Sequence, residues 1–97
     1  MNHYELMYIV APHVEGEALE AVIARVEELI NSVGGSITDV KKWGKRRLAY
    51  EINDIKDGFY VLTTFDTPPQ SLTEIDRVLK LTEQIIRFLI TKDETKI

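Results

Sequence analysis

One stretch of the chain has a spacing of apolar residues that leaves few choices for the fold. Apolar residues recur every three or four positions, at Leu19, Val22, Ile23, Val26, Leu29, Ile30 and Val33. Charged side chains occupy many of the positions between them. This spacing predicts an amphipathic helix from about Glu15, with one apolar face that another layer of structure must cover. Gly34 and Gly35 follow the last apolar position, where a left-handed backbone conformation ends a helix at little steric cost.

Segments with strand character lie on both sides of this helix. Residues 4–10 are rich in aromatic, aliphatic and β-branched side chains on nearly both faces of an extended chain, and Pro12 ends the segment because it lacks a backbone donor. A second strand is expected over residues 36–52. Its apolar residues Ile37 and Val40 are three positions apart, which predicts a bulge. Regular alternation resumes at Leu48, Tyr50 and Ile52.

The second half of the chain repeats this order. Residues 53–58 have the composition of a turn and end in an Asp-Gly pair, which suits a positive φ angle. A third strand follows over residues 59–65. Ser71 is expected to cap a second helix, with Glu74 at the third helical position. The apolar face of that helix consists of Leu72, Ile75, Val78 and Leu79. A fourth strand is predicted over residues 85–91.

The order strand, helix, strand, strand, helix, strand predicts a ferredoxin-like α+β sandwich, with a four-stranded antiparallel sheet and two helices on one face. Residues 1–97 suffice for a single domain of this kind, with a short charged tail at about residues 93–97. The expected strand order is 4-1-3-2, which places the second strand at an edge of the sheet and leaves one sheet face without helices.

Positive charge is concentrated in this second strand. Five of the seven residues from Lys41 to Arg47 are basic, whereas the chain as a whole has a net charge of −4. The other ninety residues contain seven basic and sixteen acidic side chains. The segment also contains Trp43, together with Gly44 as a second candidate for a bend. Clustered cations around one indole are the composition expected where RNA or an acidic partner docks.

Several classes of function lack support in the sequence. The chain contains no cysteine, and its two histidines, His3 and His13, are far apart without acidic company at ligand spacing, so we expect no metal site and no cofactor. Glu27 and Glu28 are adjacent on a helix and diverge by about 100°, which cannot make an acid/base pair. No apolar run approaches the roughly 20 residues that span a bilayer, and the first residues lack a signal pattern. We therefore expect a cytoplasmic protein with no small-molecule substrate.

Several segments resemble one known family. Residues 4–10, followed by Pro12, are similar to the first strand of the bacterial small-subunit (30S) ribosomal protein number six family. More specifically, Gly44 to Ile52 resembles that family's G-x-R-R-L-A-Y-x-I signature along the second strand. Gly58 to Tyr60 and Pro68 also stand where the family pattern has them. The resemblance covers nearly the whole chain.

The resemblance implies a non-catalytic component of the small ribosomal subunit. Such a protein would bind central-domain (platform) ribosomal RNA together with small-subunit ribosomal protein eighteen, as a heterodimer, and aid subunit assembly. Arg46 and Arg47 are similar in position to the family's basic pair near the RNA, and the second strand is similar to part of its partner-facing edge. We also expect the isolated, acidic chain to bind RNA poorly until a basic partner completes the surface.

The expected site residues follow from these observations. RNA contacts are expected from Lys41, Lys42, Lys45, Arg46, Arg47 and Arg87, and partner contacts from Trp43, Leu48 and Tyr50. Two of these assignments stay open at this stage. Arg87 can face RNA across the open sheet face or simply be solvated, and Trp43 can stack on a base, stack on a partner's side chain or cover the sheet edge.

Three other functions are compatible with the same element order. An RNA-recognition motif needs aromatics at three set positions of its third strand, but Val61 and Thr64 stand at two of them. An acylphosphatase needs an arginine in the loop after the first strand, and residues 11–16 contain none. A regulatory or protein-interaction module without RNA binding is not excluded, although it would not need the basic segment.

Overall fold

The structure is a computed structural model. It describes residues 2–52 and 55–92, without the side chains of residues 49–52. Four strands, two helices and one short 3-10 turn make up this part of the chain. In chain order they are β1 (Asn2–Val10), α1 (Glu17–Ser32), β2 (Ser36–Ile52), β3 (Ile55–Thr67), the 3-10 turn η1 (Pro69–Ser71), α2 (Leu72–Lys80) and β4 (Ile85–Lys92).

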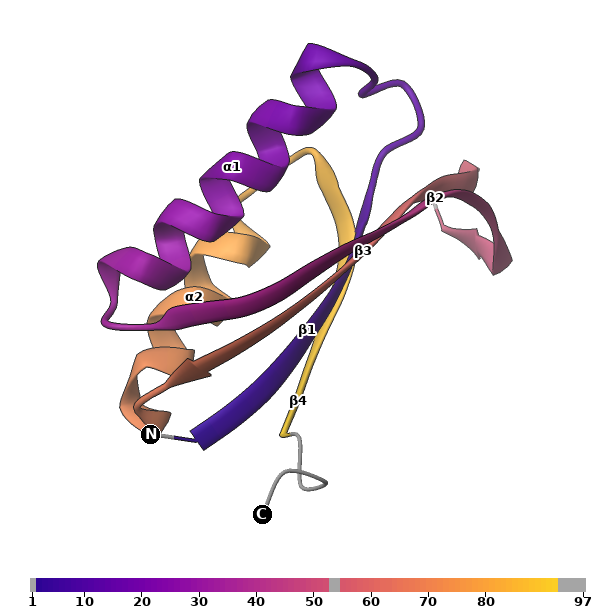
Figure 1. Cartoon of the computed structure of the whole chain (residues 1–97). Coiled ribbons are helices and arrows are strands. Elements are labelled where there is room, and N and C mark those ends of the chain that lie inside the picture. The colour runs from indigo at the N-terminus through magenta and orange to yellow at the C-terminus, as the bar shows by residue number, and fades with distance from the viewer. Residues whose placement is uncertain (1, 53–54, 93–97) are drawn as a thin grey trace.

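The four strands form one sheet in the order β2-β3-β1-β4, and every neighbouring pair is antiparallel. Both helices cover the same face of this sheet, as Figure 1 shows. The predicted fold class and strand order are therefore confirmed, and β2 lies at an edge as expected. We call the sheet face without helices the open face.

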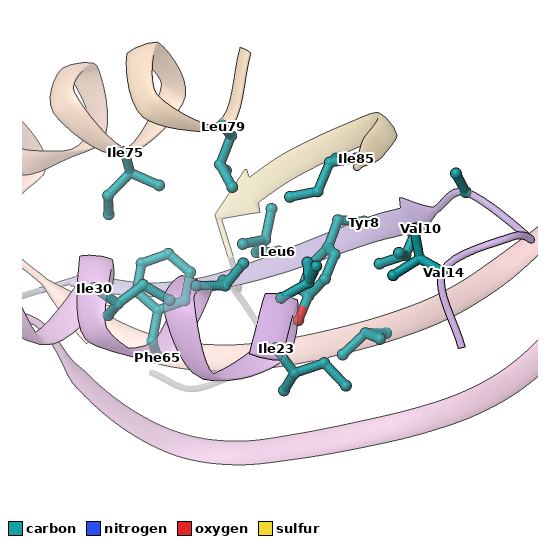
Figure 2. Close-up of a cluster of buried hydrophobic side chains, with 14 of the residues drawn as sticks. Leu6, Tyr8, Val10, Val14, Ile23, Ile30, Phe65, Ile75, Leu79 and Ile85 are labelled. Carbon is teal, nitrogen blue, oxygen red and sulfur yellow. The ribbon is translucent and has the colours of Figure 1, made fainter. Parts of the chain in front are cut away.

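The core lies between the sheet and the two helices. Alternate residues of β1 point toward the helices and are buried, because successive side chains of a strand face opposite ways. Figure 2 shows side chains from β1, β3, β4, α1 and α2 meeting in this layer. Among the most buried are Leu6, Tyr8, Val10, Ile30, Phe65, Ile75 and Leu79. Each such side chain contributes about 1.5–3 kcal/mol of transfer free energy on full burial, which makes this layer the main source of stability.

The end of α1 follows the sequence prediction. Gly34 has a φ angle of +88°, and the Gly35 N–H donates a hydrogen bond of 2.9 Å to the Ile30 carbonyl. A Cβ atom on Gly35 would lie 2.6 Å from Cγ2 of Ile30. One glycine therefore supplies the backbone conformation, and the next allows the chain to pass close to the helix.

The start of α2 differs from the prediction. Ser71 does not cap the helix with its side chain, because it already has helical angles (φ −73°, ψ −20°) at the end of η1. A capping side chain needs an extended backbone to reach the free N–H groups. The Ser71 hydroxyl instead donates a hydrogen bond of 2.7 Å to the Val33 carbonyl, which links the start of α2 to the end of α1.

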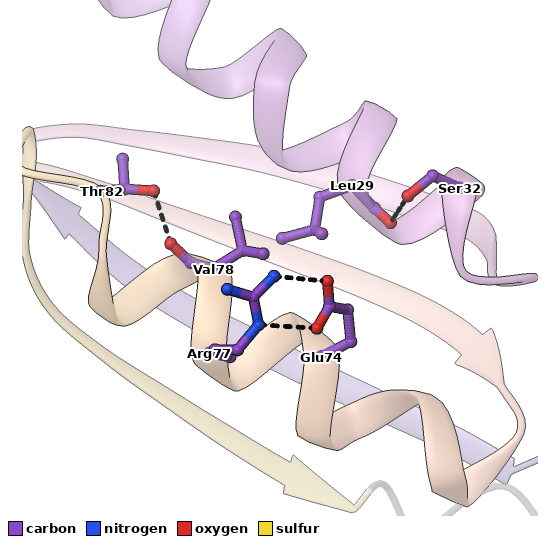
Figure 3. Close-up of polar contacts among 6 residues, drawn as sticks. All are labelled: Leu29, Ser32, Glu74, Arg77, Val78 and Thr82. Atoms are coloured by element: carbon purple, nitrogen blue, oxygen red, sulfur yellow. Dashed lines mark hydrogen bonds and ion pairs between the residues drawn. The ribbon is translucent and has the colours of Figure 1, made fainter.

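Glu74, the expected partner of that cap, has another role. Its carboxylate accepts two hydrogen bonds from Arg77, of 2.8 and 2.7 Å, one turn further along α2 (Figure 3). This pairing lowers the pKa of the Glu74 carboxyl below its usual value. Glu74 lies in the first turn of α2, but its carboxylate pairs with Arg77 on the exposed side of the helix.

The β2–β3 hairpin is longer than predicted. The β1–β3 ladder ends at the pair Val10–Phe59, but β2 and β3 continue to pair beyond it, from Arg46–Gly58 to Ile52–Ile55. Residues 55–58 are therefore strand, and the prediction of a turn there is wrong. Asn53 and Asp54, the rest of the predicted turn, lie outside the described residues.

Gly58 explains this error. A glycine is needed at this position because the chain passes close to β1, and not because it forms a turn. Its φ angle is not positive, and a Cβ atom on it would lie 2.5 Å from Cγ2 of Ile9 and 2.9 Å from the Val10 carbonyl oxygen. The sequence cannot distinguish a glycine for close approach from a glycine for a turn. We call residues 46–52 and 55–58, which run past the ends of β1 and β4, the projecting hairpin (Figure 1).

Tyr8 gives a prediction about alkaline stability. The side chain is completely buried, and its hydroxyl has no hydrogen-bond partner among the described residues. Burial, followed by the negative charge of Glu27, raises the pKa of Tyr8 far above its ordinary value of about 10. The folded protein therefore keeps the proton at a pH at which the unfolded chain loses it, so folding stability falls as the pH rises above about 10.

In Tyr8→Phe this loss disappears. We expect its free energy of unfolding at pH 7 to be close to that of the wild type, because the Tyr8 hydroxyl, although it is near Thr63, forms no well-aligned hydrogen bond that the variant would lose. Above pH 10 the free energy of unfolding of the wild type should fall relative to that of the variant by up to about 1.4 kcal/mol per pH unit. Urea unfolding followed by circular dichroism at pH 7, 10 and 10.7 measures both values. A difference between the two proteins that does not change with pH would contradict this account of Tyr8.

Candidate nucleic-acid interface

The basic segment, residues 41–47, lies on the outer edge of the sheet. It belongs to β2, which pairs with β3 on one side and has no neighbouring strand on the other within the described part of the chain. All seven of its residues are exposed. An edge strand leaves every second backbone N–H and C=O group available to solvent or to another molecule. Charge and free backbone groups therefore lie along the same edge.

The strand register divides the basic side chains between the two faces of the sheet. Lys42 lies opposite Val61, which is a core residue, so Lys42 points toward the helix side. Lys41 lies opposite Leu62, on the open face. The five cations of the segment, all expected to contact RNA, therefore do not share a single face of the sheet.

Two register shifts in β2 decide how the rest of the segment is divided. One falls between Ile37 and Asp39, where a bulge was predicted, and the other falls between Lys42 and Gly44. Gly44 has a φ angle of +85°, which confirms the second bend. Beyond it, Lys45 lies opposite Phe59 on the helix side, and Arg46 lies opposite Gly58 on the open face.

The lysines on the helix side are paired with acids at and before the start of α1. Lys42 Nζ lies 2.6 and 3.0 Å from the two carboxylate oxygens of Glu20. Lys45 Nζ lies 3.9 Å from Glu15 Oε1 and 5.7 Å from the centre of the Phe59 ring. Ion pairs as exposed as these contribute at most about 0.2–1 kcal/mol to stability. Their larger effect is to neutralise part of the positive charge, and the sequence analysis did not anticipate Glu15 and Glu20 as residues of the site.

Arg46 and Arg47 differ from the lysines. The Arg46 guanidinium lies over the Trp43 ring, 5.6 Å from its centre, and its Nε donates a hydrogen bond of 3.4 Å to the Trp43 carbonyl. Arg47 lies opposite Asp57, at the start of the projecting hairpin. Among the described residues, neither arginine has a carboxylate in ion-pair contact, whereas Lys41 lies 3.9 Å from Asp39. The two arginines are therefore the least neutralised cations of the basic segment.

The projecting hairpin contributes one more cation, which the sequence analysis missed. Lys56 is exposed and lies two residues before Gly58, so the two residues face the same side of β3. Because Gly58 lies opposite Arg46, Lys56 is on the same face of the sheet as Arg46. Because residues 53–58 were expected to form a turn, Lys56 was not assigned to any surface. The sequence Ile-Lys-Asp at residues 55–57, which alternates apolar and polar side chains as an exposed strand does, could have indicated that Lys56 belongs to a strand.

Arg87 is not part of this cluster. It is exposed on β4, opposite Ile9, and therefore lies on the open face. Three strand spacings, or roughly 14 Å, separate β4 from β2 across the sheet. With Met7, Ile9 and Leu89, it lines a shallow hollow at the other edge of the sheet. Any ligand that touches both Arg87 and Arg46 must therefore span the open face.

The open face itself is arranged in rows that cross all four strands. One row contains Lys41, Leu62, Met7 and Leu89, so a cation is followed by three apolar side chains. The next row toward the other end of the sheet contains Asp39, Thr64, Glu5 and Thr91. Leu89 keeps 62% of its surface exposed. The face therefore has an apolar centre with basic side chains on one side and acidic side chains on the other.

The three expected partner contacts have different environments. Trp43 is 44% exposed, which is unusual for so large an apolar residue. Leu48 is only 9% exposed, so it offers a partner little side-chain surface, and its expected partner contact stays a prediction. The side chain of Tyr50 lies outside the described residues.

Other kinds of site find no basis in residues 2–52 and 55–92. No three His, Cys, Asp or Glu side chains in this part gather closely enough to hold a metal ion, and His3 contacts Asp66 alone. No described helix is long and apolar enough to cross a lipid bilayer.

Comparison with known proteins agrees with this picture. The family model described as ribosomal protein S6 matches residues 3–92. Small ribosomal subunit protein bS6 from each of two strains of Desulfitobacterium hafniense is 39% identical over 94 residues, which cover 97% of this chain and 99% of the relative. The crystal structure of 30S ribosomal protein S6 from Thermotoga maritima superposes with a TM-score of 0.91 at 33% identity, over 95% of this chain and 87% of that one.

A second solved structure shares the fold alone. The C-terminal domain of the MgtC protein from Mycobacterium tuberculosis superposes with a TM-score of 0.64 at 14% identity, over 97% of this chain and 89% of that one. Such a likeness carries no information about function.

The fold, the local charge and these matches define a structural, non-enzymatic protein of the small ribosomal subunit. The chain belongs to the ribosomal protein S6 family, which confirms the resemblance found in the sequence. As a ribosomal protein it is part of a cytoplasmic ribonucleoprotein, among ribosomal RNA and other ribosomal proteins.

Proposed function

We propose that this chain binds the central-domain (platform) RNA of the small subunit jointly with small-subunit ribosomal protein eighteen, and that it aids assembly of the subunit. The observation that carries the proposal is the position of Arg46 and Arg47. They are exposed at the base of the projecting hairpin, without carboxylate partners among the described residues, on an otherwise acidic chain. The division of the open face into basic, apolar and acidic zones supports a protein partner beside the RNA.

Electrostatics explains why the two arginines matter more than the three lysines. A cation gains most from a phosphate when it does not first have to leave a carboxylate. Lys42 and Lys45 are partly neutralised by Glu20 and Glu15, whereas Arg46 and Arg47 present planar guanidinium groups that bind phosphate in a bidentate manner. The chain's net charge of −4 opposes RNA at long range. A basic partner would remove that penalty, so binding should be strongest in the complex.

The first test uses the double variant Arg46→Ala, Arg47→Ala. In the complex with protein eighteen, we expect its affinity for a platform RNA fragment to fall at least tenfold at 50 mM salt. The slope of log K against log salt should become shallower by about 1–2, because two phosphate contacts are lost. Filter binding at two or more salt concentrations, with and without protein eighteen, measures both quantities.

A matched control is available outside the basic segment. Arg25→Ala, Lys92→Ala removes the same charge from two exposed positions, on α1 and at the end of β4, that have no ion pair with a described residue, and it should change affinity by less than threefold. Equal losses in the two double variants would mean that only net charge matters. Unchanged affinity of the Arg46, Arg47 variant would remove this pair from the interface. If no RNA is bound even with protein eighteen present, the regulatory-module alternative becomes the better account.

The second test concerns Glu20. Replacing it with glutamine should release Lys42 from its ion pair and raise RNA affinity by about two- to fivefold, which corresponds to the free energy of an exposed pair. Glu28→Gln is the matched control, because Glu28 is equally exposed on α1 and forms no ion pair with a described residue. The same filter-binding assay measures the effect. A decrease in affinity for Glu20→Gln would show instead that Glu20 positions Lys42 for the RNA.

The third test concerns the partner. Leu89 lies at the end of the apolar row on the open face and is 62% exposed, so a protein that covers this face would bury it. Leu89→Asp should weaken the complex with protein eighteen at least tenfold, because the variant buries an unpaired charge. Leu81→Asp is the control, since Leu81 is 69% exposed just after α2 and is not part of the sheet. Isothermal titration calorimetry with purified protein eighteen distinguishes them, and equal binding by Leu89→Asp and the wild type would exclude this face as the docking surface.

A further inference from the structure

Trp43 has a place in the sheet that its neighbours do not share. The register passes from the pair Lys42–Val61 directly to the pair Gly44–Tyr60, so Trp43 is the extra residue of a bulge and has no partner across the ladder. The next residue, Gly44, has a φ angle of +85°, and no atom lies within 4 Å of the position of a Cβ there. The bulge therefore projects the indole from the edge of the sheet beside an unobstructed stretch of backbone.

Arg46 fixes the indole in this position. Its guanidinium lies over the ring at 5.6 Å from the centre, and its Nε donates a hydrogen bond to the Trp43 carbonyl. These two contacts hold the side chains as one stacked pair. The pair is therefore already ordered, and a ligand loses less binding free energy to fixing the two side chains. Trp43 nevertheless keeps 44% of its surface exposed, so part of the ring remains open for stacking.

The surroundings of the indole favour a nucleobase over a protein side chain. Lys41, Lys42, Lys45 and Arg46 all lie within three residues of Trp43 and are exposed. A base brings phosphates on both sides of it, which Arg46 can neutralise directly and the three lysines can neutralise by exchanging their present carboxylates. A protein segment would have to bring several acids. Stacking on an aromatic face requires a base that is not already inside a duplex.

We propose that Trp43 and Arg46 form a stacking site for one unpaired nucleobase of RNA, with the flanking cations on its phosphates. This inference rests on the proposed function and assigns Trp43 to the RNA, where the sequence analysis had placed it among the partner contacts. The site should select single-stranded over duplex RNA, because only an unpaired base can stack on the indole. It should not select a particular base, because every base has a face that can stack.

The chain provides its own probe, because Trp43 is its only tryptophan. The full chain is titrated at low salt with a ten-nucleotide single-stranded RNA of mixed sequence and, separately, with a duplex of the same length. We expect the single strand to quench the fluorescence of Trp43 and the duplex to bind without quenching. Trp43→Leu should weaken single-strand binding by about 5- to 150-fold, which is the value of one stacked base, and leave duplex binding within twofold. Binding of the variant is followed by fluorescence anisotropy of labelled RNA.

A second variant and a folding control distinguish loss of stacking from loss of structure. Trp43→Phe retains an aromatic face and should keep most of the single-strand affinity, and circular dichroism checks that each variant is folded. Equal affinity of Trp43→Leu and the wild type for the single strand, or equal quenching by the duplex, would overturn the stacking site while leaving phosphate binding intact. A fluorescence change on adding protein eighteen alone, after any tryptophan in it has been replaced, with no further change on adding RNA, would assign Trp43 to the partner instead. If neither RNA binds the chain, with or without protein eighteen, the proposed function fails as well.

Discussion

The two-residue period of the sheet is the constraint on which the rest of this structure depends. Helices α1 and α2 bury one face, so every second residue of β1 and β3 must fit beneath them, and most of these residues are apolar, with Thr63 and Thr67 as buried polar exceptions. The remaining side chains are thereby assigned to the open face, whatever their chemistry. Along β2 the same rule distributes the charge, because a one-residue shift reverses the direction of the side chains that follow it. The register shifts before Asp39 and before Gly44 therefore set which cations face the helices and which face outward.

This distribution gives the edge strand two chemically different sides. On the helix side, Lys42 and Lys45 are paired with Glu20 and Glu15, which neutralises part of the positive charge there. On the other side, Arg46 lies over Trp43, next to an apolar row that crosses the sheet to Leu89. Under the proposed function, the basic segment can contact RNA and still leave room for a protein partner, because Arg46 and Leu89 lie at opposite edges of the open face.

Some features of the fold and the site could be predicted because they depend on neighbours in sequence. The α1 periodicity, its glycine end and the irregularities of β2 are all local, and all are observed. The failures have a common origin in distant contacts. Gly58 resembled a turn residue but is required by the approach of Ile9 and Val10, and Ser71 resembled a cap but donates to Val33.

The sequence by itself determined the element order, the apolar face of each helix, the concentration of cations on one strand and the family to which the chain belongs. These follow from periodicity, composition and a local signature, which exist before the chain folds. Only the tertiary structure decided the direction of each cation and its partner. Lys42 lies 22 residues from Glu20 in sequence, and nothing in the spacing of either residue indicates that they meet. Their contact depends on how α1 crosses the sheet, and that crossing is set by core packing and not by charge.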